Sequence, residues 1–241
     1  MKKGNLVLTV LMLLVLTLGL VSASRAAEFT IGFSQMENNM PFRIAETNSI
    51  KEIEKNHPEV KVIVTDAQSS LAKQVSDCLD LIARGVDFLV IAPREYEGFQ
   101  PVFDAAKKAG IPVMLIDREA AGVPGEDFVT MAGANFWYEG RQAALFLVAS
   151  MQGKGNIIEL VGTSGSSVAR DRQGGFQEVI KYFPEMKVIA SQPANFTRME
   201  ALTVMENLIQ QHGDEIDAVY AHNDEMALGA IQALEAAGLP Q

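Results

Sequence analysis

Cysteine and basic residues are scarce in this chain. Cys78 is the single cysteine among 241 residues, so no disulfide can form within one chain. The 20 lysine and arginine residues are outnumbered by 30 aspartate and glutamate residues, which gives a formal net charge of −10. Because an acidic surface repels phosphate groups, this balance disfavours binding to DNA or RNA.

The motifs of common enzyme classes are also missing. Residues 162–166 do not form G-x-S-x-G, because Gly165 comes one place too early. The sequence contains no P-loop and no H-E-x-x-H. Its histidines, His57, His212 and His222, lack the spacing of metal ligands. We therefore expect no catalysis, no metal and no cofactor. The G-T-S-G stretch at residue 162 fits a strand–helix turn better than a phosphate cradle.

Residues 1–26 have the layout of a secretory signal peptide. Two lysines follow the first residue, an almost unbroken apolar run covers residues 6–21, and small residues suited to cleavage end at Ala23 and Ala26. An uncleaved anchor helix is the alternative, but the run is short for a membrane span. No cysteine stands at the cleavage point, so a lipid anchor is not supported. We expect a periplasmic or otherwise extracytoplasmic protein. Its mature part has 17 basic and 30 acidic residues, a formal charge of −13.

Short β-branched runs alternate with amphipathic stretches in the first part of the mature chain. The spacing predicts strands over residues 30–34, 60–66, 88–92 and 113–116, and helices over residues 42–56, 71–84 and 99–109. Strands separated by helices indicate a parallel sheet covered by helices.

A turn-rich loop over residues 120–126 and a short strand over residues 128–132 interrupt this rhythm. The second series predicts strands over residues 156–160, 187–190 and 218–221, and helices over residues 138–151, 168–183, 199–211 and 225–236. The fold class is thus α/β with two lobes, over residues 27–132 and 133–241.

The chain ends in a helix-to-strand connection, so we expect the second lobe to be incomplete and the sequence to be truncated at its C-terminus. We also expect this chain alone to be marginally stable and to bind ligand poorly.

One predicted helix carries the cysteine on an apolar face. That face comprises Leu71, Val75, Cys78, Leu79 and Ile82. The pattern predicts that Cys78 is a buried small hydrophobic residue rather than a reactive thiol.

Polar and aromatic side chains follow successive strands, where ligands bind in open α/β sheets. They are Gln35, Phe42, Arg43, Asp66, Asp117, Arg118, Arg170, Asp171, Arg172, Asn195, Phe196, Arg198, His222, Asn223 and Asp224. Arginine, aspartate and asparagine side chains match the paired hydroxyls of a sugar, and aromatic rings pack on its C–H faces. The recurrence of such residues at one end of the strands favours a shared sugar site.

Each of these features also has a simpler interpretation. Asp117 and Arg118 are compatible with a surface ion pair of little energetic value. The run from Arg170 to Arg172 is compatible with a solvated helix start. Asp224 is a natural N-cap for the last helix, which Gly238 would close, so Asn223 and Asp224 are compatible with capping alone.

Six segments together resemble periplasmic sugar-binding proteins of the ribose-binding type (periplasmic binding protein type 1), and the resemblance covers residues 30–239. They are P-F-R-I-A-E-T at residue 41, G-V-D-F-L-V-I-A-P at 85, I-P-V-M-L-I-D-R at 111, S-V-A-R-D-R-Q-G-G-F at 167, N-F-T-R at 195 and A-H-N-D-E-M-A-L-G-A-I-Q-A-L at 221. The F-S-Q at Phe33, F-R-x-A-E-T and Y-A-H-N-D resemble the galactofuranose-binding branch in particular.

The resemblance implies two Rossmann-like lobes that close on one sugar without catalysis. Mapped onto this sequence, the sugar ligands of the family are Phe42, Arg43, Asp117, Arg118, Asn135, Arg172, Phe196 and Asn223. Arg43 stands where ribose binders carry an aromatic residue, which favours a galactofuranose-like sugar or a related aldose over ribose. One further acidic ligand of the family would lie beyond Gln241.

The resemblance also implies partners, namely a monosaccharide and the membrane permease of an ABC transporter, and a monomeric state. Two other binding roles remain open at this point. One is a sensory protein that presents its sugar to a membrane receptor or kinase. The other is the sugar-sensing core of a transcriptional repressor, which the signal peptide and the absent helix-turn-helix disfavour.

Overall fold

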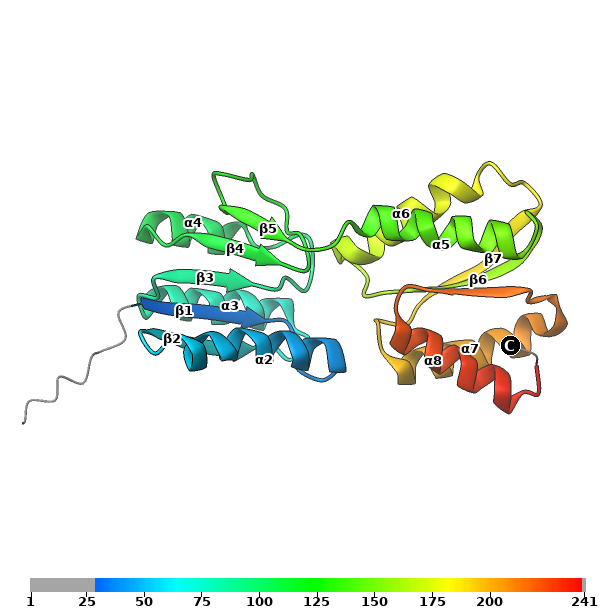
Figure 1. Ribbon diagram of the computed structural model, residues 1–241, viewed down its shortest axis with the longest axis horizontal. Coiled ribbons are helices and arrows are strands. Elements are labelled where there is room, and N and C mark those ends of the chain that lie inside the picture. The colour runs from blue at the N-terminus through cyan, green and yellow to red at the C-terminus, as the bar shows by residue number, and fades with distance from the viewer. Residues whose placement is uncertain (1–28, 240–241) are drawn as a thin grey trace, which may run out of the picture.

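The computed structural model describes residues 29–239, which form two α/β lobes (Figure 1). The first lobe contains β1–β5 and α2–α4, and the second contains α5–α8 and β6–β8. The predicted signal peptide lies outside the described residues. Within these residues, no helix is long and apolar enough to cross a membrane. The division into sugar-binding domains at residues 132/133 stays a prediction.

The first lobe is built on a five-stranded parallel sheet in the order β2-β1-β3-β4-β5. Its strands are β1 (Phe29–Gln35), β2 (Val60–Asp66), β3 (Phe88–Ile91), β4 (Val113–Ile116) and β5 (Thr130–Ala132), and its helices are α2 (Pro41–Asn56), α3 (Leu71–Ala83) and α4 (Gln100–Ala109). Leu89 and Ile91 pack with residues of α3 and α4, whereas Val90 belongs to the cluster that Ile50 of α2 covers. Helices therefore cover both faces of the sheet, as the alternation predicted.

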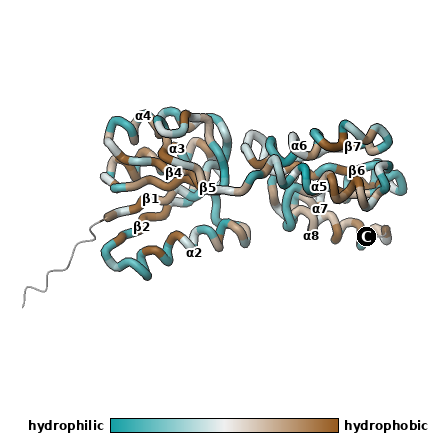
Figure 2. The backbone as a smooth tube through the Cα atoms, turned by 45° about the horizontal axis from the view of Figure 1, so that its top comes forward, coloured by the Kyte–Doolittle hydropathy of each residue, from teal (hydrophilic) through white to brown (hydrophobic). Residues whose placement is uncertain are grey.

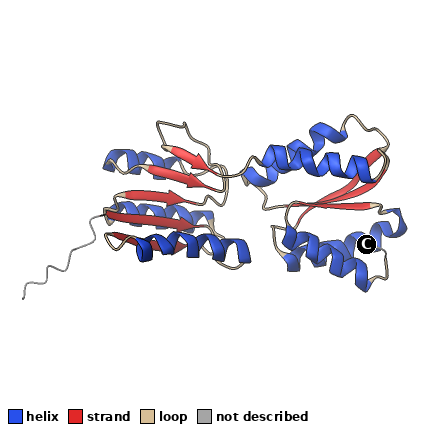
Figure 3. Cartoon of the chain, viewed as in Figure 1, coloured by secondary structure: helices blue, strands red, loops and turns tan. Residues whose placement is uncertain are grey.

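The second lobe repeats this arrangement around a three-stranded parallel sheet in the order β7-β6-β8. Its elements are α5 (Phe136–Ser150), β6 (Gly155–Val161), α6 (Ser167–Ile180), β7 (Met186–Pro193), α7 (Arg198–His212), the short 3-10 helix η1 (Gly213–Glu215), β8 (Ala218–Ala221) and α8 (Asp224–Ala236). Ile157 packs with α5 and α6, and the next residue, Ile158, packs with α7 and α8. Both faces of β6 are thus buried, which suits its apolar sequence (Figures 2 and 3).

The strand orders place a switch point in each lobe. β1 lies between β2 and β3, and β6 lies between β7 and β8. In the first sheet, the chain therefore leaves β1 toward one edge and, after β2, crosses back to the other side of β1. In the second sheet, it leaves β6 toward one edge and, after β7, crosses back to the other side of β6. In open α/β sheets such a reversal opens a crevice beyond the carboxyl ends of the strands.

Helix starts differ from the sequence predictions by one or two residues, and the caps explain why. α5 begins at Phe136 because the side chain of Asn135 accepts a hydrogen bond from the Tyr138 N–H at 2.9 Å. The prediction of Asp224 as the N-cap of the last helix was wrong. Asn223 caps α8, since its side chain accepts from the Met226 N–H at 2.9 Å, and Asp224 is the first helical residue.

Cys78 is fully buried against α4 and the first sheet, as its helical face predicted, although Leu79 on the same predicted face is exposed. Burial raises the pKa of the Cys78 thiol to about 12. The thiol is therefore protonated at neutral pH and hidden from reagents.

We expect no labelling of native Cys78 by a thiol-specific reagent at pH 8, and complete labelling after denaturation. Mass spectrometry of the intact protein measures both. Rapid modification of the folded protein at pH 8 would show that Cys78 is not buried.

Candidate ligand-binding site

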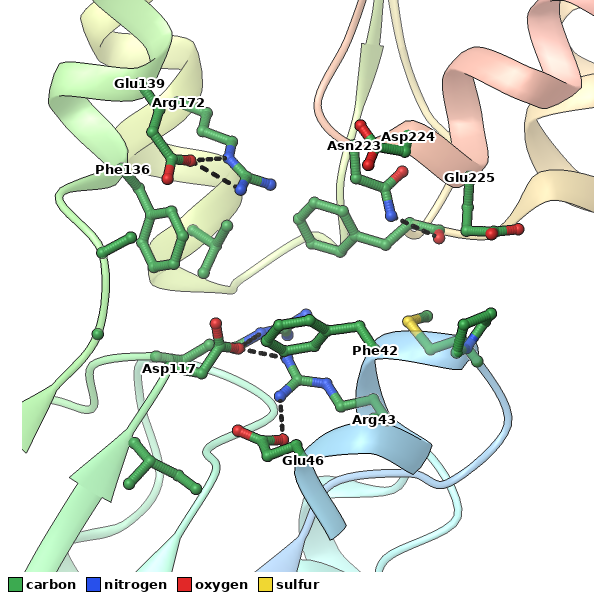
Figure 4. A pocket seen from close by; sticks show the side chains of 18 of the residues that line it. Phe42, Arg43, Glu46, Asp117, Phe136, Glu139, Arg172, Asn223, Asp224 and Glu225 are labelled. Atoms are coloured by element: carbon green, nitrogen blue, oxygen red, sulfur yellow. Dashed lines mark hydrogen bonds and ion pairs between the residues drawn. The ribbon is translucent and has the colours of Figure 1, made fainter. Parts of the chain in front are cut away.

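A cavity of about 640 Å³ lies between the two lobes, beyond the carboxyl ends of both sheets (Figure 4). Seven of the eight predicted site residues line it: Phe42, Arg43, Asp117, Arg118, Arg172, Phe196 and Asn223. In Figure 4, Phe42, Arg43, Glu46 and Asp117 form one wall, and Phe136, Glu139, Arg172 and Asn223 form the facing wall. Each wall thus combines charged groups with an aromatic ring.

Arg43 is the centre of the first-lobe wall. Its side chain is buried, and its two terminal nitrogens bind Glu46 Oε2 at 2.7 Å and Asp117 Oδ2 at 2.5 Å. Burial alone would lower the pKa of Arg43, but the charges of Asp117 and Glu46 outweigh it and raise that pKa. Asp117 itself has a left-handed backbone, with φ of 61°, which aims its carboxylate at Arg43.

Arg118 lies beside this pair and reaches across to the second lobe. Its guanidinium packs 5.1 Å from the centre of the Phe196 ring, and its Nη1 donates to the Arg94 carbonyl at 3.0 Å. Burial and the nearby charge of Arg43 lower the pKa of Arg118 to about 9. The buried Nε of Arg118 makes no hydrogen bond within residues 29–239. It lies 3.7 Å from Asp117 Oδ2, so it is connected to that carboxylate by charge rather than by a hydrogen bond.

Arg172 has the corresponding position in the second-lobe wall. Its Nε and Nη2 donate to Glu139 Oε2 at 3.0 and 2.8 Å, and its Nη1 donates to the carbonyl of His222. Its guanidinium packs 4.9 Å from the centre of the Phe136 ring. These contacts fix a planar hydrogen-bonding group at the cavity surface.

Phe196 is buried in the same wall. Its backbone is left-handed, with φ of 64°, and its carbonyl accepts from the Asn223 side chain at 3.0 Å. Its ring lies over Gly162, where an added Cβ would come within 1.9 Å of the ring. A side chain at residue 162 would therefore displace the ring from the cavity.

The eighth predicted ligand, Asn135, does not line the cavity. It is exposed, and its side chain caps α5.

Among the other strand-end residues, Gln35 is buried behind the cavity and donates to Glu46 at 2.9 Å. Arg198 pairs with Glu225 at 3.0 Å. The described residues contain no cluster of histidine, cysteine and carboxylate side chains that could hold a metal ion.

Comparison with known proteins gives the family. A profile described as "Periplasmic binding protein domain" matches residues 31–241. This chain belongs to that family. The family assignment agrees with the resemblance seen in the sequence.

Two curated relatives have similar sequences. The Galactofuranose-binding protein YtfQ of Escherichia coli is 42% identical over 222 residues, which are 90% of this chain and 69% of the relative. The Ribose import binding protein RbsB of Bacillus subtilis is 41% identical over 212 residues, 88% of this chain and 67% of the relative. This periplasmic binding protein therefore spans somewhat over two thirds of each relative.

Two solved structures resemble the fold closely. A galactofuranose-binding protein is 40% identical with a TM-score of 0.84, over 88% of this chain and 72% of that structure. The fructose-binding periplasmic domain of a hybrid two-component system is 34% identical with a TM-score of 0.81, over 88% of this chain and 69% of that structure. The two-lobed fold is thus the one these binding proteins share.

Several lining residues of this periplasmic binding protein were not predicted from its sequence. They are Met40, Pro41, Glu46, Phe136, Glu139, Val168 and Glu225 among others. The spacing of residues along a helix could have indicated two of them. Glu46 follows Arg43 by three residues on α2, and Glu139 follows Phe136 by three residues on α5, so each pair shares a helical face.

A second set of contacts joins the lobes beside the cavity. The Tyr96 N–H donates to the Gly165 carbonyl at 2.8 Å, and the Glu119 N–H donates to the Ser167 hydroxyl at 2.9 Å. Arg170, a strand-end candidate that does not line the cavity, packs 4.4 Å from the centre of the Tyr96 ring. These contacts hold α6 of this periplasmic binding protein against the first lobe.

Proposed function

We propose that this protein is the exported binding component of an ABC-type uptake system and captures a neutral monosaccharide between its lobes. The supporting observation is the cavity at the facing strand ends, which combines arginine, carboxylate and amide groups with three phenylalanine rings. Hydroxyl groups both donate and accept, so they suit paired guanidinium and carboxylate groups. The rings suit the C–H faces of a sugar.

The charges in the cavity favour a neutral ligand. Arg43 is matched by Glu46 and Asp117, and Arg172 is matched by Glu139. Asp224 and Glu225 add carboxylates at the start of α8. An anionic ligand would therefore meet no excess of positive charge, and its own charge would be costly to bury.

The names of the relatives support a furanose sugar. One relative and one solved structure are named for galactofuranose, and another relative is named for ribose import. We infer that the ligand is a galactofuranose-like sugar or a related aldose, held by Phe42, Arg43, Asp117, Arg118, Arg172, Phe196 and Asn223. Asn135, which the resemblance also implied, is inferred to act as a helix cap. Delivery to a membrane permease, export through a cleaved signal peptide, a monomeric state and the lack of catalysis belong to this proposal.

Isothermal titration calorimetry with a panel of sugars tests the ligand class, and it is run on this chain and on a version extended to the length of its relatives. The panel contains galactose, arabinose, ribose and fructose, methyl furanosides and pyranosides of galactose with a fixed ring, galacturonate and a sugar phosphate. We expect binding of neutral sugars that form furanose rings, and no binding of the two anionic compounds. Binding of galacturonate as tight as that of any neutral sugar would contradict the proposal.

A sensory role is the second candidate, because one similar structure is the periplasmic domain of a two-component system. Gene deletion in the host separates the two roles. Loss of uptake of the labelled sugar supports transport. Normal uptake with loss of the transcriptional response to the sugar supports sensing.

A further inference from the structure

A buried histidine–glutamate pair lies behind the second-lobe wall of the cavity. His222 follows β8 and Glu159 lies in β6; they are 2% and 1% exposed, and His222 Nε2 is 3.1 Å from Glu159 Oε1. The other carboxylate oxygen accepts from the Ser191 hydroxyl at 2.7 Å and from Gln173 Nε2 at 3.0 Å. Burial would raise the pKa of Glu159, but the hydrogen bonds from His222, Ser191 and Gln173 outweigh it and lower that pKa. Glu159 is therefore a buried carboxylate anion.

The contacts of His222 require a proton on one ring nitrogen and none on the other. Nε2 faces the Glu159 carboxylate, so it must carry a proton and donate. Nδ1 lies 3.4 Å from the Gly162 nitrogen, which is itself a donor, so Nδ1 must accept. A neutral ring with its proton on Nε2 satisfies both contacts. A second proton on Nδ1 would set one N–H against another.

His222 is connected to three lining residues of the cavity. Its carbonyl accepts from Arg172 Nη1, which fixes one end of that guanidinium. The next residue, Asn223, donates to the Phe196 carbonyl at 3.0 Å. Gly162, which donates to the imidazole, is the residue on which the Phe196 ring lies. A shift of the imidazole would therefore move the wall of the cavity at several points.

We propose that the His222–Glu159 pair is a positioning device that holds the second-lobe wall in its binding geometry and makes ligand affinity depend on pH. The proposal rests on the sugar-binding function proposed above. Neutral His222 aligns Gly162, Phe196 and Arg172. Acid places a proton on Nδ1, breaks the bond from Gly162 and weakens binding.

Other charged or titratable groups lie around His222 or in the same wall of the cavity, among them Tyr220, Arg172, Glu139 and Asp224. The Tyr220 ring lies 4.9 Å from the imidazole, and burial raises the pKa of its hydroxyl, so it stays neutral. Arg172 contacts the His222 carbonyl and is paired with Glu139. Histidine is the side chain whose charge ordinarily changes between about pH 5 and 8. The other histidines, His57 and His212, precede β2 and η1, at the amino ends of the sheets and away from the cavity.

Calorimetry between pH 5 and 8 with a neutral sugar from the panel tests the proposal. We expect the affinity of the wild type to fall about tenfold at the acid end, as expected for the loss of a buried hydrogen bond. His222→Gln retains an amide donor for Glu159 but cannot titrate. It should bind within about threefold of the wild type at pH 8 and show no fall in acid, whereas His222→Leu should bind at least about tenfold more weakly at pH 8. The control variants His57→Gln and His212→Gln should keep the wild-type profile. A flat wild-type profile, or a His222→Gln variant that still weakens in acid, would overturn the proposal.

Nitrogen-15 NMR of the histidine rings gives a readout that needs no ligand. We expect one ring, missing from the spectrum of His222→Gln, to have a protonated Nε2 and a bare Nδ1 at pH 8. Its protonation in acid should coincide with shifts of the Gly162 and Asn223 amides. A doubly protonated ring at pH 8, or amides that do not respond, would overturn the proposal. If no sugar in the panel binds either version of the wild type, the proposed function fails, and this spectrum still decides whether the pair positions the wall.

Discussion

Replacing Arg43 with alanine is expected to lower both the stability of the protein and its affinity for sugar. The guanidinium is 2% exposed and separates two carboxylates, Glu46 and Asp117. Without it, these carboxylates face each other at the cavity wall with no cation between them. Loss of one partner of a buried ion pair costs about 3–5 kcal/mol of stability. Because the carboxylates keep some exposure, we expect the lower end of that range, about 3 kcal/mol.

The affinity effect of Arg43→Ala has a separate cause. Arg43 also lines the cavity, so we expect its guanidinium to contact the ligand. Loss of a charged hydrogen bond to the ligand should cost about 1.5–3 kcal/mol, which is roughly a 10- to 150-fold weaker binding constant. Calorimetry measures the affinity, and urea unfolding followed by circular dichroism measures the stability.

Two further variants separate charge from geometry. Arg43→Lys keeps the positive charge but has no planar fork, so it should restore more of the stability than of the affinity. Lys51→Ala removes a cation from an exposed position of the same helix, and should change neither quantity measurably. If Arg43→Ala binds sugar within about twofold of the wild type, Arg43 is not a ligand.

The elements and part of the cavity wall could be predicted because they depend on local pattern. Strand and helix periodicity is set by burial of one face, and the predicted strands 60–66, 113–116 and 218–221 agree with the structure at both ends. The carboxyl ends of parallel strands share an edge, so Asp117, Phe196 and Asn223 were expected to meet. These predictions required no knowledge of how helices pack side by side.

Contacts between neighbouring helices and strands were beyond the sequence patterns. Asn135 and Asn223 both cap helices, yet only Asn223 lines the cavity. The bond between His222 and Glu159 joins residues that are 63 positions apart, so no spacing rule connects them. The glycines gave no signal in the sequence either. Their role depends on which atoms of another element pack against them.

The packing of α5 against α6 depends on such glycines, and Gly175→Ala is expected to disrupt it. A Cβ at residue 175 would lie 2.0 Å from the carbonyl oxygen of Trp137, a backbone atom that no rotamer change can move. The two helices must separate to relieve the clash. Overpacking of this kind costs about 1–3 kcal/mol or more, against about 1 kcal/mol gained from alanine's higher helix propensity. We expect a net loss of about 2 kcal/mol, which lowers Tm by roughly 4–8 °C in a protein of this size.

The neighbouring residue provides a matched control. A Cβ at residue 174 would also come close to an atom, at 2.3 Å, but that atom belongs to the ring of Trp137, which is 43% exposed and can turn outward. Gly174→Ala gains the same helix propensity, loses the hydrogen bond from Trp137 to Glu178 and should stay within about 1 kcal/mol of the wild type. Thermal unfolding of both variants measures the difference. Equal Tm values for the two would mean that the helix backbones are not in contact.

The same helix contact connects stability to binding. Gly140 meets the carbonyl oxygen of Arg172, where an added Cβ would lie at 2.1 Å, so the backbone of α5 supports the residue whose guanidinium lines the cavity. Separation of α5 from α6 would move Phe136 away from Arg172, although neither side chain is changed. Gly175→Ala should therefore weaken sugar binding as well as lower Tm, and Gly174→Ala should leave affinity close to that of the wild type. A Gly175→Ala protein that is less stable but binds sugar normally would show that the helix contact supports the fold alone.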